Sequence, residues 1–311
     1  MTYLGYPFAQ HALIAATLIA VTSGLIGPFV ASRDMAFAVH GTAELAFPSA
    51  VAGLLIAGDA VNGALIGSLV TATAIGLLGE RRSERNMVIG VILAFGLGLG
   101  VFLLSFYHGF ASEATNILFG SIVTVSTADI VVLSGIAVVV MAAVWIVYWP
   151  LLFASIDTEV AAARGVKVRG LGLLFVYLLA VTVTEAAQIV GTLLVLSLTI
   201  TPAAAARRVS SNPLRVTGLA IVFALLAADG GFLLSLVFVN TNTKASVFIT
   251  FISFGTYLVA RVIGGVRNRS ARRRVRNQAQ LGLERATRAF GDAADANAAE
   301  QLPHRPWSSN V

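Results

Sequence analysis

The sequence predicts an all-α membrane protein, a polytopic bundle of about eight or nine transmembrane helices. Hydrophobic residues make up 57% of the 311 positions and charged residues only 12%, whereas a soluble domain carries about 25% charged residues. Mean hydropathy is +0.86. The apolar residues gather into repeated runs, several of which reach the roughly 20 residues that cross a bilayer as a helix. A large soluble core does not explain these three observations together.

Nine apolar runs follow one another along the chain, and each is expected to be a helix because backbone groups in lipid must be satisfied within the segment. Three of the runs are short, so the helix count is eight or nine. The runs are rich in Gly, Ala, Ser and Thr, which let helices approach closely. They lie at 12–31, 43–58, 62–78, 87–106, 130–153, 171–185, 188–203, 216–239 and 246–263.

The Lys and Arg residues predict the orientation, because short cytoplasmic loops carry an excess of positive charge. With nine spans, Lys244 is the one residue among the 21 Lys and Arg residues that falls on the outer side. This places the N-terminus outside and the C-terminus in the cytoplasm of a multi-pass protein of the cell (inner) membrane. The inner-side positive charges are Arg33, Arg81, Arg82, Arg85, Arg164, Lys167, Arg169, Arg207, Arg208, Arg215 and the segment from Arg261 onward.

Composition divides the chain into a transmembrane domain at 1–263 and a tail at 264–311. The tail begins with an arginine-rich block and continues as an Ala- and Asp-rich polar stretch. This pattern favours a positive anchor with a disordered cytoplasmic extension. Binding of anionic lipid or of nucleic acid is the sharper alternative; the pI of 10.2 comes largely from the tail and says little about nucleic acid, so no nucleic-acid partner is expected.

Catalysis has little support in the sequence. The two lysines, Lys167 and Lys244, follow Val166 and Thr243, so no G-K-[ST] phosphate loop is present. The chain also has no cysteine and therefore no thiolate metal ligand. We expect a transport subunit that is not an enzyme, has no stably bound cofactor, and depends on another polypeptide for any ATP energy.

Ionisable residues inside spans are costly and usually face a cavity or a pathway. His40 and Glu44 are four residues apart at the start of the second run, which puts both side chains on one helix face. An imidazole and a carboxylate can together bind a divalent cation such as zinc or manganese. An interfacial ion pair is the alternative.

Two further acids are candidates for a secondary role in a pathway. Glu185 is expected at the turn between two short spans, where a carboxylate facing water is the simpler interpretation. Asp229 lies inside the eighth run. A hydrogen bond to a neighbouring helix would also explain it.

The loop between the fifth and sixth runs predicts a short cytoplasmic helix that docks a partner. Asp157 suits the N-cap, Glu159 the positive end of the helix, Arg164 the negative end and Gly165 the residue after the C-cap. Ala161 lies in the Ala-rich middle. An ordinary surface helix is the alternative.

An ordered set of motifs resembles the ABC-3 metal permeases, the membrane subunits of zinc, manganese and iron ABC importers. The resemblance covers roughly residues 12–263. The motifs are Asp157-x-Glu159-x-Ala161 with Gly165, Ile89-Gly90-Val91, Asn116-Ile117-Leu118-Phe119-Gly120, Val190-Gly191-Thr192-Leu193-Leu194 and Thr201-Pro202-Ala203-Ala204-Ala205-Ala206.

The resemblance implies a type II ABC importer-like permease that forms a homodimer, with a cytoplasmic ATPase and an extracytoplasmic metal-binding protein as partners. The segment 157–165 then corresponds to the coupling helix. The family's second span carries Asp-x-x-x-His before a proline. Aligned on Pro48, these positions fall on His40 and Glu44, so the two ligand types are exchanged.

The sequence leaves three candidate functions for this chain. The leading one is a permease for zinc or manganese, with Pro202 kinking a helix beside the path because it lacks a backbone donor. A gradient-driven secondary transporter that uses Glu185 or Asp229 as its coupling acid is the second. An ABC permease for a metal-chelate cargo is the third.

Overall fold

The computed structural model describes residues 6–78, 82–106, 125–238, 244–266 and 280. All regular structure in this part of the chain is helical, and eight of its helices are long and apolar enough to cross a membrane. The prediction of an all-α membrane bundle is therefore confirmed. The chain separates into two compact units, Met1–Arg261 and Val262–Val311. Nearly all of the predicted tail lies outside the described residues, so its disorder stays a prediction.

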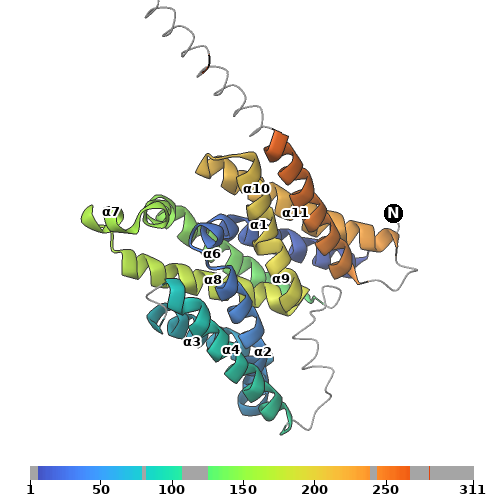
Figure 1. Cartoon of the computed structure of the whole chain (residues 1–311). Coiled ribbons are helices and arrows are strands. Elements are labelled where there is room, and N and C mark those ends of the chain that lie inside the picture. The colour runs from blue at the N-terminus through green and yellow to red at the C-terminus, as the bar shows by residue number, and fades with distance from the viewer. Residues whose placement is uncertain (1–5, 79–81, 107–124, 239–243, 267–279, 281–311) are drawn as a thin grey trace, which may run out of the picture. The chain divides into compact units, whose positions relative to one another are not determined.

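The helices follow the predicted order, and Figure 1 shows them coloured along the chain. They are α1 (Pro7–Ser32), α2 (Ala36–Ala57), α3 (Ala60–Leu78), α4 (Arg82–Leu104), α6 (Thr127–Ile156), α7 (Thr158–Ala163), α8 (Val168–Val190), α9 (Thr192–Thr199), α10 (Thr201–Val209) and α11 (Pro213–Val237). A last helix covers Ala245–Val266.

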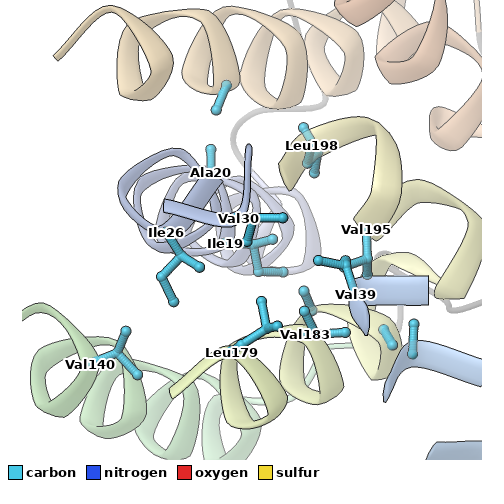
Figure 2. Close-up of a cluster of buried hydrophobic side chains, with 14 of the residues drawn as sticks. Ile19, Ala20, Ile26, Val30, Val39, Val140, Leu179, Val183, Val195 and Leu198 are labelled. Atoms are coloured by element: carbon cyan, nitrogen blue, oxygen red, sulfur yellow. The ribbon is translucent and has the colours of Figure 1, made fainter. Parts of the chain in front are cut away.

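Helix α1 lies at the centre of the first unit. It packs against α6, α8, α9, α10 and α11. Figure 2 shows its side chains Ile19 and Val30 surrounded by apolar residues of α2, α6, α8 and α9, among them Leu179 and Leu198. By contrast, α4 is peripheral: only 17% of its spanning stretch is buried, against 67% for α1. The exposed apolar face of α4 therefore fits contact with lipid.

Helices α2 and α3 form a tight antiparallel pair. Gly58 has a φ of 71°, which turns the chain after α2, and the Asp59 side chain then caps α3 by accepting hydrogen bonds from the N–H groups of Val61 (2.9 Å) and Asn62 (3.1 Å). These bonds, chiefly the one from the Asn62 backbone, hold the pKa of the exposed Asp59 carboxyl below its ordinary value. The two helices can approach closely because Gly53 faces Gly63: a Cβ on Gly53 would lie 2.5 Å from the Gly63 Cα.

Several predicted boundaries were wrong, and three of them bear on the candidate sites. The second span begins at Ala36 rather than 43, so the connection after α1 is only the short segment 33–35. The sixth span continues to Val190 rather than 185. The predicted run at 188–203 is divided, because α8 stops at Gly191 with a φ of 96° and a second interruption at Ile200 separates α9 from α10. Polar residues interrupted the hydropathy pattern in the first two places although the helix continues through them.

Candidate metal pathway and coupling helix

His40 and Glu44 both lie within α2, one helical turn apart. Together with Phe37 they follow a partly exposed stripe on this helix, and the rings of Phe37 and His40 have centroids 6.1 Å apart. The adjoining surface of α2 packs on α4, where a Cβ on Gly41 would lie 2.6 Å from Cγ2 of Ile89 and a Cβ on Gly90 would lie 3.9 Å from Cε1 of Phe37. The pair therefore lies beside the α2–α4 contact, on the partly exposed side of α2.

The His40 imidazole carries an unused nitrogen. Its Nδ1 atom is buried and has no hydrogen-bond partner within the described part of the chain. Buried polar atoms are normally hydrogen-bonded, so such an atom calls for an explanation. A neutral imidazole nitrogen is also the commonest protein ligand for transition metals. With Glu44 one turn away, the stripe offers one nitrogen and one carboxylate to a cation.

The predicted short helix is present as α7, with the predicted caps. The Asp157 Oδ1 atom accepts hydrogen bonds from the N–H groups of Glu159 (3.1 Å) and Val160 (3.0 Å). At the other end, Arg164 is the C-cap and Gly165 has a φ of 84°. The Val166 N–H donates back to the Ala161 carbonyl at 3.0 Å, closing a Schellman-type end.

One face of α7 packs against the rest of the protein, and the other face is exposed. Ala161 is fully buried, whereas the neighbouring Glu159 is exposed. The apolar side chains of Ile156 and Val160 are 71% and 46% exposed. A loop that presents charged and apolar side chains on a rigid, capped helix is suited to contact another protein.

Arg33, placed at the end of α1, joins this region to the bundle. Its Nε atom donates to the Ser155 Oγ at 2.8 Å, and its guanidinium lies 5.2 Å from the centroid of the Phe175 ring. The contacts link α1, the end of α6 and α8 directly beside α7. The sequence placed Arg33 on the inner side but gave no sign of this bracing role.

Pro202 lies in the first turn of α10, directly after the interruption at Ile200. Because proline has no N–H, the Leu198 carbonyl loses the donor that a continuous helix would supply. Just upstream, the Ser253 Oγ donates to the Ser197 carbonyl at 2.9 Å. Helix α1 approaches the end of α9 very closely at this point, because a Cβ on Gly27 would overlap the Thr199 carbonyl oxygen.

The two further candidate acids have different surroundings. Asp229 in α11 is half-buried and accepts a hydrogen bond from the Thr17 Oγ1 of α1 at 3.1 Å. For Asp229, the alternative given by the sequence, a hydrogen bond to a neighbouring helix, is therefore what the structure shows. Glu185 lies inside α8 and is only 6% exposed, so the interpretation as a loop carboxylate facing water was wrong.

The structure brings together only part of the predicted site. His40 and Glu44 share a helix face, while Glu185 lies near the far end of α8 and Asp229 lies in α11. No group of three or more His, Cys, Asp or Glu side chains able to hold a metal occurs among the described residues. One copy of the chain therefore offers two protein ligands at α2.

Comparisons with known proteins find relatives of this chain among the membrane proteins of manganese and zinc transport systems. The chain is 31% identical over 236 residues to the manganese transport system membrane protein MntC of Halalkalibacterium halodurans, covering 76% of this chain and 81% of that one. It is 27% identical over 240 residues to the high-affinity zinc uptake system membrane protein ZnuB of Haemophilus influenzae, covering 76% and 91%.

Solved structures show the same fold. A chain of PsaBC from Streptococcus pneumoniae, solved in complex with Fab, matches with a TM-score of 0.73 at 26% identity, covering 82% of this chain and 91% of that one. The ABC 3 transport family matches residues 5–263, which is nearly the whole helical bundle. The chain belongs to the ABC 3 transport family.

Proposed function

We propose that this chain is the membrane-spanning permease subunit of an ATP-driven importer of divalent metal ions, zinc or manganese. The observation that carries the proposal is the His40–Glu44 pair on one partly exposed face of α2, with a buried and unpartnered His40 Nδ1. The relatives named for manganese and zinc transport support the same cargo.

The metal ion is the substrate, and the pair would coordinate it only in passing. Two ligands from one chain leave most positions around the ion to water or to a partner. A two-fold homodimer that apposes the α2 stripes would supply two imidazoles and two carboxylates, the four ligands that zinc favours. Transport requires that the ion also leaves, so binding at each position has to stay weak.

Energy would come from a cytoplasmic ATPase that docks on α7. The exposed Glu159, Ile156 and Val160 side chains provide a mixed charged and apolar surface for it. The bracing contacts of Arg33 with Ser155 and Phe175 would transmit a displacement of α7 to α1 and α8. An extracytoplasmic metal-binding protein would deliver the ion on the opposite side.

The two alternatives have weaker support. A gradient-driven transporter would have to use Glu185 as its coupling acid, because Asp229 is already engaged by Thr17, and the named relatives belong to a manganese transport system and a zinc uptake system instead. Co-purification of an ATPase subunit with this chain would exclude that alternative. A metal-chelate cargo is supported only by a fold likeness at 18% identity, with a TM-score of 0.61.

The test is metal uptake by proteoliposomes that contain the full complex, with zinc, manganese and iron in competition. We expect His40→Ala and Glu44→Ala each to abolish uptake while membrane insertion is retained. His11→Ala is the matched control, because His11 lies in α1 outside the pair. Normal uptake in both His40→Ala and Glu44→Ala would refute the pathway assignment.

A further inference from the structure

A second polar site lies at the end of the bundle opposite to α7. It is a cavity of about 190 Å³ between the start of α3, the start of α6 and the end of α8. Asp129, Glu185 and Gln188 supply its polar lining, and Val61, Val132 and Ile189 are among its apolar walls. None of these residues belongs to the α2 stripe.

Glu185 is the unusual member of this lining. Its side chain is only 6% exposed and its Oε1 atom has no hydrogen-bond partner, and the Nε2 atom of Gln188 is likewise buried and unpartnered. Burying a carboxylate without a partner is strongly unfavourable, so buried charges are normally paired or coordinate metals. Among the described residues that line the cavity there is no Lys, Arg or His. A bound cation would supply the positive charge that keeps a buried Glu185 ionised.

We propose that Glu185, Asp129 and Gln188 form a binding site for a hard divalent cation such as Mn²⁺. All three can present oxygen: two carboxylates and, after rotation of its amide, the Gln188 carbonyl. Asp129 is held in place because its Oδ2 atom accepts hydrogen bonds from the Ser126 N–H (2.9 Å) and Oγ (2.8 Å). Oxygen donors suit manganese, calcium and magnesium, whereas zinc is more often held by nitrogen and sulfur.

The dimensions fit an ion that keeps part of its hydration shell. A water occupies roughly 30 Å³ in the liquid, so the cavity of about 190 Å³ admits the ion with several waters. Three protein oxygens and a few waters complete an octahedral shell of the kind that such cations prefer.

This site is separate from the α2 stripe. His40 is one turn from the start of α2, whereas Glu185 lies about 25 Å along α8 from its first residue at 1.5 Å per residue. With α7 in the cytoplasm, the cavity opens on the extracytoplasmic side, where it would receive an ion before the stripe does. That role in transport rests on the proposed function, whereas binding of the cation does not.

The binding test uses the full-length chain in lipid nanodiscs, with Mn²⁺ itself as the probe. Free Mn²⁺ is followed by electron paramagnetic resonance during a titration. We expect Glu185→Gln, which keeps the shape and removes the charge, to weaken binding at one site by at least tenfold, since even the loss of a residue that only supports a ligand costs about 10- to 100-fold. Asp229→Asn is the matched control, because that acid lies in α11 outside this cavity, and its titration should equal that of the wild type.

A second readout separates a binding role from a structural one. Mn²⁺ should raise the melting temperature of the wild type and of Asp229→Asn but not that of Glu185→Gln, because a ligand stabilises only the protein that binds it. Without metal, Glu185→Gln should melt at the same temperature as the wild type or higher, since an unpaired buried charge has been removed. A destabilised Glu185→Gln with unchanged Mn²⁺ binding would overturn the proposal.

The two proposals fail in different ways. A His40→Ala/Glu44→Ala double variant should still bind Mn²⁺ at the Glu185 site, even though its uptake is lost. If Glu185→Gln binds Mn²⁺ like the wild type while the double variant loses all binding, the cavity is no cation site and the α2 stripe is the only one. If Glu185→Gln alone loses a binding site and the double variant transports normally, the cation site in the cavity is supported and the assignment of His40 and Glu44 to the pathway is refuted.

Discussion

The hydrogen bond between Thr17 and Asp229 shows how single polar residues are accommodated in this bundle. The single hydroxyl proton of Thr17 is shared between two acceptors, the Asp229 Oδ1 at 3.1 Å and the Leu13 carbonyl at 2.8 Å. Such interhelical bonds in membranes average about 0.6 kcal/mol and reach about 1.7. However, a carboxylate that loses its partner while half-buried has a larger penalty than the bond itself contributes.

We therefore expect Thr17→Val, which keeps the shape and removes the donor, to lower the free energy of unfolding by about 1–2 kcal/mol. The combined Thr17→Val/Asp229→Leu variant should lie close to the wild type, because replacing both partners by apolar groups leaves nothing unsatisfied. Thermal unfolding in one detergent checks both. Equal destabilisation in the single and the double variant would show that Asp229 is held by other contacts.

The residue types at the candidate sites could be read from the sequence, but their surroundings could not. His40 and Glu44 at i and i+4 were predicted to share a face because that follows from helix geometry alone. Glu185 was misplaced because its burial depends on α3 and α6, which are distant in sequence. Gln188 was expected beside Glu185 because it is three residues away in the sequence. Asp129 was missed as a neighbour because no local pattern indicates that the start of α6 meets the end of α8.

At the scale of elements, α7 was the most predictable part of the molecule. Its limits are set by local chemistry, with the Asp157 carboxylate at one end and the left-handed Gly165 at the other. The start of α2 was predicted poorly, since polar side chains lower the local hydropathy although the helix runs on. The interruption between α9 and α10 could be only partly inferred from Pro202, because the close approach of Gly27 is a tertiary contact.

The proposed coupling role of α7 leads to a prediction about charge. We expect Glu159→Arg to uncouple ATP hydrolysis from transport: ATPase activity of the assembled complex should persist while metal uptake falls. Charge reversal at an exposed contact puts like charges together if the partner surface is basic, and it also opposes the positive end of the helix, worth about 0.3–1 kcal/mol. The ratio of metal transported to ATP hydrolysed in proteoliposomes measures this.

Glu159→Gln is the matched control, because it removes the charge without reversing it and keeps the Asp157 cap. Its coupling ratio should lie between those of the wild type and Glu159→Arg. A wild-type ratio in Glu159→Arg would show that α7 is an ordinary surface helix.

At the scale of the whole molecule, the orientation of the C-terminal helices in the membrane depends on whether the divided segment α9–α10 crosses it. Eight helices are long enough to cross a membrane, and α9 has 8 residues and α10 has 9. Joined end to end they extend about 26 Å at 1.5 Å per residue, close to the hydrocarbon thickness of roughly 30 Å. If the pair crosses as a ninth span, α7 and the end of α10, with Arg207 and Arg208 in its last turn, lie on the same side.

Cysteine labelling tests this topology, and the chain is suited to it because it contains no cysteine of its own. We introduce single cysteines at the exposed positions Ala163, Ser211 and Thr127 and treat intact cells with a membrane-impermeant maleimide. With nine crossings, Thr127→Cys is labelled from outside, whereas Ala163→Cys and Ser211→Cys react only after the membrane is opened. The unmodified chain is the control and should stay unlabelled in both conditions. Labelling of Ser211→Cys in intact cells, with Ala163→Cys protected, would mean that α9–α10 turns back without crossing, and the C-terminal helices would then have the opposite orientation.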